Sequence, residues 1–197
     1  HNSHLYLGTT LPGGFEVWRT TGSEPERDGW KLVVDKGAGD ALNQIPLSIG
    51  VFRDLIYVGS ALFGIRSIDP GGGLVPPKGF DVIRVYPDDR WELIIGGPPV
   101  EPTEPTTGTR GQALSGRPSG FGNITNAYCW QLQAQGDQLY LGTFDWAVLL
   151  PHTLPGALEN LGAQLPFDPQ NYLTVLNDYL DYLRSINPIL GLLPAID

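Results

Sequence analysis

"LYLGTT" (residues 5–10) is the first of three closely similar segments, and "IYVGSA" (56–61) and "LYLGTF" (139–144) follow it along the chain. In each copy, apolar residues flank a tyrosine, and a glycine follows two residues later. This alternation is typical of a strand that ends where the backbone turns or is closely approached. A segment that recurs after about 50 residues indicates a repeating structure, so the strands around it should recur as well.

Three further kinds of strand recur around this segment, each in two copies. Their sequences are LSIGVF (47–52) and AYCWQLQA (127–134), FEVWRT (15–20) and FDVIRV (80–85), and GWKLVVDKG (29–37) and RWELIIGGP (90–98). Polar turns connect them in a constant order, which predicts four antiparallel strands per repeat, joined by hairpins. Four short antiparallel strands in a unit of about 50 residues are typical of a β-propeller blade.

The expected fold is therefore all-β, a partial β-propeller of about three incomplete four-stranded blades over residues 1–150. These residues supply the last three strands of one blade, all four of the next and the first two of a third. A closed propeller needs about four blades or more, so two edges of backbone would stay unpaired, which is unfavourable. We expect a second polypeptide, a homologous subunit or the rest of a cleaved precursor to complete the propeller.

One part of the repeat resembles a known class of protein. The segment GGFEVWRTTGSEPERDGWKLV (13–33) is similar to the region around the Asp-box in bacterial propellers of the sialidase/BNR type, and Asp28, Gly29 and Trp30 match the end of that motif. The second copy, VYPDDRWELI (85–94), keeps its aspartates and tryptophan but has Arg90 in place of the glycine. The resemblance implies a propeller fold in which the aspartate caps a turn and the tryptophan fills space between blades. It implies no particular activity, because propellers host many functions.

Residues 151–197 depart from the repeat and are expected to form a helical insertion or extension. The segment DPQNYLTVLNDYLDYLRSINP (168–188) has leucines at helical spacing. Asp168 is a suitable N-cap, Pro169 suits the first helical position, and Asn187 before Pro188 ends the pattern. Such a helix either packs on the propeller or on a short helical partner around 154–162, or it covers one mouth of the channel as a lid or a subunit contact.

Composition argues against some partners. The net charge is −9 and the few Lys and Arg residues are scattered, which disfavours nucleic acid or an anionic membrane surface. No segment reaches the ~18 consecutive apolar residues of a membrane-spanning helix. The one cysteine, Cys129, cannot form an internal disulfide and lies in an apolar run, where a buried thiol is expected. The expected location is extracellular or periplasmic.

Candidate ligand-binding residues lie around the third copy of the repeat, beside the strands that should border the mouth of a propeller channel. They are Asn126, Tyr128, Trp130, Asp145 and Trp146. Aromatic rings beside an amide and a carboxylate suit a sugar, a phenol or another flat polar ligand. The alternative is that Tyr128 and Trp130 pack between blades.

Two classes of function stay open on these observations. In the first, the chain is a rigid scaffold that binds a ligand, such as a small molecule or a carbohydrate, or a partner protein. In the second, it is part of a propeller enzyme whose active site is shared with the remaining blades and covered by the helical insertion. The sequence contains no recognisable nucleophile–base set and no metal motif, so no catalytic residue, metal ligand or cofactor is assigned. Ca²⁺ held by loop carbonyls and carboxylates stays an open alternative.

Overall fold

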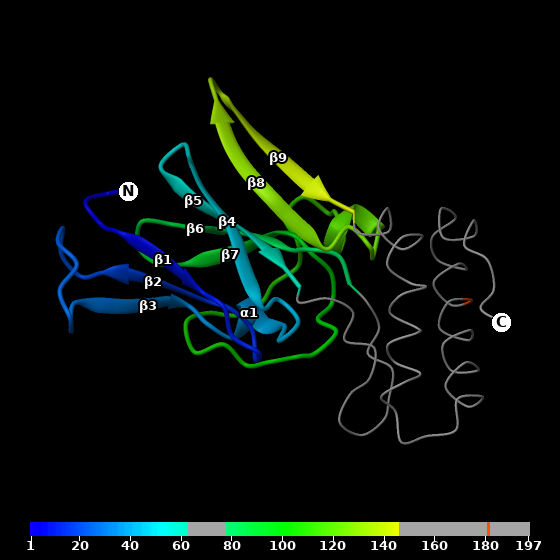
Figure 1. The fold of residues 1–197 in the computed structure, drawn as a ribbon, viewed down its shortest axis with the longest axis horizontal. Coiled ribbons are helices and arrows are strands. Elements are labelled where there is room, and N and C mark those ends of the chain that lie inside the picture. Colours follow the sequence, from blue (N-terminus) through cyan, green and yellow to red (C-terminus); the bar gives the residue numbers. More distant parts are fainter. Residues whose placement is uncertain (63–77, 146–180, 182–197) are drawn as a thin grey trace, which may run out of the picture. The chain divides into compact units, whose positions relative to one another are not determined.

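The computed structural model describes residues 1–62 and 78–145 together with Asp181, and the chain divides into two compact units, His1–Asp145 and Trp146–Asp197. Asp181 is helical. The rest of the helix expected over 168–188 lies outside the described residues. The first unit consists of antiparallel strands, and a long connection over residues 96–127 joins two of them (Figure 1).

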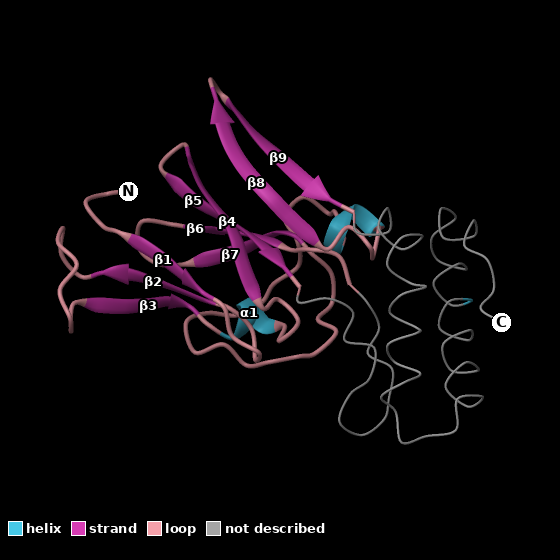
Figure 2. Cartoon of the chain, viewed as in Figure 1, coloured by secondary structure: helices cyan, strands magenta, loops and turns pink. Residues whose placement is uncertain are grey.

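Consecutive strands of the first unit pair in three sets (Figure 2). The first set is β1 (Tyr6–Thr9), β2 (Glu16–Thr20) and β3 (Trp30–Val34); the second is β4 (Ile45–Phe52), β5 (Leu55–Ala61), β6 (Val82–Val85) and β7 (Trp91–Ile95); the third is β8 (Tyr128–Gln135) and β9 (Gln138–Phe144). One residue pair, Ala61 with Tyr128, links the second set to the third. The all-β prediction is confirmed for this unit. Among the described residues the sheets do not close into a ring.

Corresponding strands of different sets pair in the same register. The equivalent pairs are Tyr6–Arg19 and Tyr57–Arg84, Val17–Val34 and Val82–Ile95, and Ser48–Gly59 and Gln131–Gly142. A β-bulge interrupts the ladder at the corresponding place in each copy. Bulges re-aim the strand that carries them, so their repetition means that equivalent strands bend alike.

Two apolar layers join the three sets. Neighbouring side chains of a strand point to opposite faces, so Ile56 and Val58 of β5 enter one layer and Tyr57 enters the other. The layer between the first and second sets contains Phe15, Val17, Val33, Val34, Ile56, Val58, Ile83, Val85, Trp91 and Leu93. The layer between the second and third sets contains Phe80, Val82, Ile95, Cys129 and Leu132, with Tyr57, Leu139 and Leu141 packed against it. The second set therefore has a neighbour on each face, as Figure 1 shows.

A left-handed turn precedes the first strand of the second set, and a similar turn precedes the third. α1 (Lys36–Gly39) and the short 3₁₀ segment η1 (Ser119–Gly122) both contain residues with positive φ inside them. The first glycine of each turn has φ of 60° (Gly37) or 56° (Gly120). Glycine adopts this region without the steric cost that a Cβ brings, which explains its presence in both turns.

The long connection between β7 and β8 crosses to the turn at the end of the first set. We call residues 98–107 of this connection the strap. The carboxylate of Asp35 accepts hydrogen bonds of 2.8–3.3 Å from the amide and hydroxyl groups of Thr106 and Thr107. The strap contains four prolines, which have no N–H group to donate, so bonds from its threonines to this carboxylate help to hold it in place.

The two turns with Asp-box-like sequences differ in their contacts. Asp28 is exposed. Asp89, in contrast, accepts two hydrogen bonds from Arg19, of 2.6 and 2.8 Å, and one of 2.6 Å from Lys31, so it ties the second set to the first. Trp91 is 6% exposed and packs in the layer between these sets.

Candidate functional site

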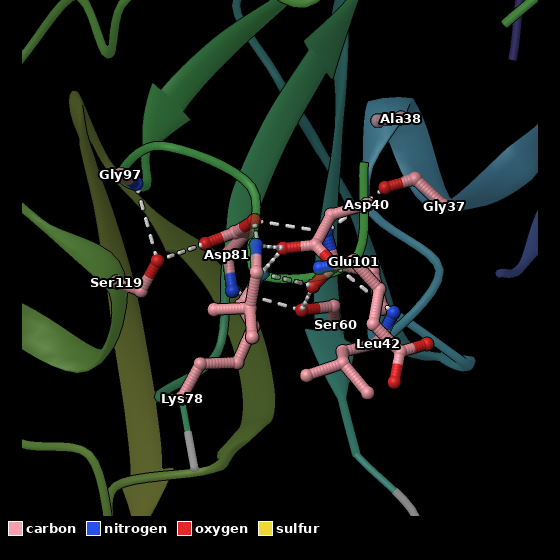
Figure 3. A network of polar contacts seen from close by, with 12 residues as sticks. Gly37, Ala38, Asp40, Leu42, Ser60, Lys78, Asp81, Gly97, Glu101 and Ser119 are labelled. Carbon is pink, nitrogen blue, oxygen red and sulfur yellow. Dashed lines mark hydrogen bonds and ion pairs between the residues drawn. The ribbon is translucent and has the colours of Figure 1, made fainter. Parts of the chain in front are cut away.

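Polar side chains gather at the end of the second set where β4 begins and β5 ends, as Figure 3 shows in part. This polar cluster comprises Asp40, Asn43, Ser60, Lys78, Asp81, Arg110 and Ser119. Its members come from the α1 turn, β5, the lead into β6 and the connection that carries the strap. A buried charge is costly unless it is paired and hydrogen-bonded, so the pairing decides what the cluster can do.

Lys78 lies at the centre of the cluster and is 4% exposed. Its Nζ donates to Asp81 Oδ2 at 2.8 Å, to Asp40 Oδ2 at 2.9 Å and to Asn43 Oδ1 at 3.1 Å. An ammonium group has three donors, and here each has an acceptor. Lys78 is therefore fully engaged within the protein.

The Asp81 carboxylate accepts hydrogen bonds from four side chains of the cluster. Oδ2 accepts hydrogen bonds from Lys78, Asn43 and Arg110, each at 2.8 Å, and Oδ1 accepts one from the Ser119 hydroxyl at 2.6 Å. Burial alone raises the pKa of this carboxyl, but the charges of Lys78 and Arg110 outweigh it and hold the pKa below the ordinary value of 3.8. Asp81 therefore stays ionised.

Arg110 lies in the long connection between β7 and β8 and binds this connection to the cluster. Its guanidinium donates to the carbonyls of Ala38 (3.0 Å) and Gly97 (2.9 Å) as well as to Asp81. Asp40, opposite, also accepts from the amide of Val100 in the strap at 2.9 Å. Two carboxylates and two cations thus balance one another, and the cluster acts as a clamp that joins the second set, the α1 turn and the strap.

The end of the third set repeats the backbone of this region without its charges. The segments GAGDALN (37–43) and GFGNITN (120–126) share their glycines and their final asparagine, Asn43 or Asn126. The recurrence of this glycine–asparagine pattern is a signal that sequence reasoning missed. It marks the turn before the first strand of a set.

The two asparagines make equivalent contacts. The carbonyl of Asn43 accepts from the amide of Phe15 at 2.6 Å, and that of Asn126 accepts from the amide of Phe80 at 3.0 Å. Each side-chain amide donates to the carbonyl of the first glycine of its motif, at 2.9 and 3.3 Å. The side-chain oxygens differ. Asn43 Oδ1 accepts from Ser60 at 2.9 Å and from the lysine of the cluster, whereas the buried Asn126 Oδ1 has no partner in the described part of the chain.

Three aromatic rings meet beside this asparagine, at the end of the β8–β9 hairpin. Tyr128 and Phe144 lie 5.8 Å apart between ring centroids, Tyr128 and Trp130 lie 6.3 Å apart, and Trp130 and Phe144 lie 5.9 Å apart. These separations suit edge-to-face contact. Trp130 is nevertheless 61% exposed, so this aromatic cluster presents an indole face to its surroundings.

The predicted ligand-binding residues are thus only partly brought together. Tyr128 and Trp130 share the aromatic cluster, which also includes Phe144, a residue that sequence reasoning did not single out. Asn126 is 9% exposed, and Asp145 accepts a hydrogen bond of 2.7 Å from Asn123. Trp146 lies outside the described residues.

A pocket of about 840 Å³ lies elsewhere, between the strap and the returning part of the long connection. Its lining includes Gly39, Gly97, Pro98, Pro102, Pro105 and Arg110, and none of the four predicted ligand-binding residues that the structure describes. The guanidinium at its wall is already bound to the polar cluster. A ligand would therefore meet mainly proline rings and backbone.

Cys129 is buried, as expected. Burial raises the pKa of its thiol to about 11, and the hydrogen bond from Ser48 only partly offsets this. A thiol with so high a pKa stays protonated near neutral pH and is a poor nucleophile. The role of Cys129 is therefore to pack in the apolar layer between the second and third sets.

No group of three or more His, Cys, Asp or Glu side chains within residues 1–62, 78–145 and 181 is placed to hold a metal ion. Within the same residues, no helix has both the length and the apolar character needed to cross a membrane.

No protein-family model, curated protein or solved structure matches this chain.

Proposed function

We propose that this chain is part of a β-propeller of the sialidase/BNR repeat type that serves as a rigid scaffold for binding. In this proposal the three strand sets are blades, and the four strands of the second set form a complete one. The observation that carries the proposal is the shared register of equivalent strands, bulges included. The two apolar layers support it, because the sets stack on one another through equivalent faces.

The exposed apolar face of the first set supports the proposal that strands of another polypeptide complete the propeller. Leu5 and Leu7 of this face are 51% and 48% exposed, although Ile56 and Val58, at the equivalent positions of β5, are 2% and 1% exposed. An apolar face of this kind marks a contact surface. A second polypeptide or a homologous subunit that supplies the next blade would bury it.

The aromatic cluster is the proposed ligand site of the scaffold. An exposed indole that is braced by two other rings offers a flat, rigid surface on which a sugar ring or another planar polar ligand can stack. The carboxylate of Asp145 lies at the same end of the hairpin. A hydrogen bond to this carboxylate would orient a ligand that the ring holds by stacking.

An oligosaccharide array, followed by calorimetric titration of any glycan that binds, tests this proposal. We expect binding by the unaltered chain and a loss of about tenfold or more in the Trp130→Ala variant, because stacking on an aromatic ring supplies much of the contact area. The control is Tyr140→Ala, which removes another half-exposed ring of β9 outside the cluster. Equal effects of the two substitutions, or no binding to any glycan, would refute the ligand site. Cleavage of a bound glycan would favour the enzyme alternative.

A further inference from the structure

β9 is a sheet edge in the part of the chain that the structure describes, where it pairs with β8 alone. In the second set the equivalent strand, β5, has β6 along that edge, with Tyr57 opposite Arg84. An edge strand exposes a row of N–H and C=O groups that can pair with an added strand. The register of β6 on β5 therefore shows how an added strand would lie on β9.

Asn126 gives a second and independent indication of what that strand carries. Its side chain is nine-tenths buried, yet Oδ1 has no hydrogen-bond partner among the described residues. A buried acceptor without a donor destabilises the folded chain, because it has lost its hydrogen bonds to water. The equivalent oxygen of Asn43 accepts a hydrogen bond from Nζ of Lys78, which lies in the segment just before β6. Of the two donors that reach Asn43 Oδ1, Ser60 belongs to β5 and Lys78 to the segment just before β6, so a strand in the place of β6 would bring Asn126 the second of these donors.

The surroundings of Asn126 suit a cationic donor. In the polar cluster, the ammonium of Lys78 lies between the carboxylates of Asp40 and Asp81. In the third set Asn123 replaces Asp40, but Asp145 supplies a carboxylate 2.7 Å from the side-chain nitrogen of this residue. A lysine that reached Asn126 would therefore arrive beside a negative charge, which favours its ionised form.

We propose that β9 accepts a β-strand from a second polypeptide, and that a lysine at the start of this strand donates to Asn126 Oδ1. An acidic residue three positions later, equivalent to Asp81, would accept from the Asn126 amide. Residues 146–197 contain no lysine, so none of their segments has the sequence required. The inference rests on the scaffold part of the proposed function and names the chemistry of its partner.

A labelled synthetic peptide tests the proposal directly. The peptide KGFDVIRVYPDD (78–89) reproduces the strand that fills this place in the second set. We expect it to bind the whole chain in a fluorescence anisotropy titration. A peptide with alanine in place of its lysine should bind about tenfold to a hundredfold more weakly, because a charge-assisted hydrogen bond is lost. The chain also offers a natural control, GGFEVWRTTGSE (13–24), which has Gly13 at the position of the lysine and should bind as weakly.

Variants of the chain locate the peptide on Asn126. Asn126→Leu should weaken binding of the lysine peptide as much as loss of the lysine does, and the two changes together should cost no more than either alone. The peptide with alanine in place of its lysine should bind Asn126→Leu as well as it binds the unaltered chain, which guards against a general folding defect of the leucine variant. Absence of peptide binding, or binding that Asn126→Leu leaves unchanged, would overturn the inference. Hydrogen exchange of β1–β9 tests the scaffold separately, since unprotected strands would refute the scaffold itself.

Discussion

At the scale of single residues, the glycine in the shared strand segment is required by packing in one copy and not in another. A Cβ on Gly59 would overlap the sulfur of Cys129 and lie 2.7 Å from Ser48 Oγ. A Cβ on Gly142, at the equivalent position of β9, would make only ordinary contact with Gln131 at 3.7 Å. The difference arises because β5 lies against β8, whereas the corresponding face of β9 is exposed.

This difference predicts unequal costs for two identical substitutions. Gly59→Ala should lower the free energy of unfolding by about 1–3 kcal/mol, because the extra methyl group overfills a packed contact. Gly142→Ala should change it by no more than about 0.5 kcal/mol. Urea unfolding followed by circular dichroism measures both. Equal losses would mean that β9 is packed in solution as closely as β5.

At the scale of elements, hydrogen bonds to the carboxylates of Asp35 and Asp40 hold the strap in place. Burial by itself raises the pKa of Asp35, but hydrogen bonds from Thr106 and Thr107 outweigh it, and the pKa is lowered from the ordinary 3.8. The folded state therefore binds the proton less readily than the unfolded state does. The stabilisation by Asp35 is complete above about pH 4 and is lost as the pH falls through the lower, folded-state pKa.

We therefore expect the effect of Asp35→Asn to depend on pH. The substitution should lower the free energy of unfolding by about 1–3 kcal/mol near neutral pH, because the amide cannot replace the charged acceptor. The difference from the unaltered chain should shrink as the pH falls below 3.8. Urea unfolding between pH 2 and 7 measures this, with Glu104→Gln, an exposed carboxylate of the same strap, as the control. A difference that is constant with pH would contradict the assignment of the stabilisation to the ionised carboxylate.

At the scale of the whole molecule, equivalent positions differ in burial according to whether a neighbouring set covers them. Ile56 is 2% exposed in the layer between the first and second sets, and Leu5, the equivalent residue directly before β1, is 51% exposed. Ile56→Ala should therefore cost about 2–5 kcal/mol and Leu5→Ala no more than about 0.5 kcal/mol, as measured by urea unfolding of the chain alone. If a second polypeptide covers β1, the cost of Leu5→Ala should rise in the complex. A large cost in the isolated chain would instead show that Leu5 is already buried there.

The sequence was sufficient to predict the strands, their order and their hairpin connections. Those features follow from local patterns, because alternating apolar residues and the turns between them act over a few residues. It was also sufficient for the burial of Cys129 and for the proximity of Tyr128 and Trp130, which lie on one strand. The recurring glycine–asparagine turn was equally local and could have been found.

Only the tertiary structure decided which distant residues meet. Asp40, Lys78 and Arg110 are separated by tens of residues and lie in loops of unrelated sequence, yet they share one buried network through Asp81. Pairing of this kind depends on how the strand sets stack, and no local pattern encodes it. The same holds for the contact of Asp35 with the strap and for the oxygen of Asn126, which has no hydrogen-bond partner among the described residues. Burial makes these contacts important for stability, because a charge or an acceptor that is removed from water must find its partner within the protein.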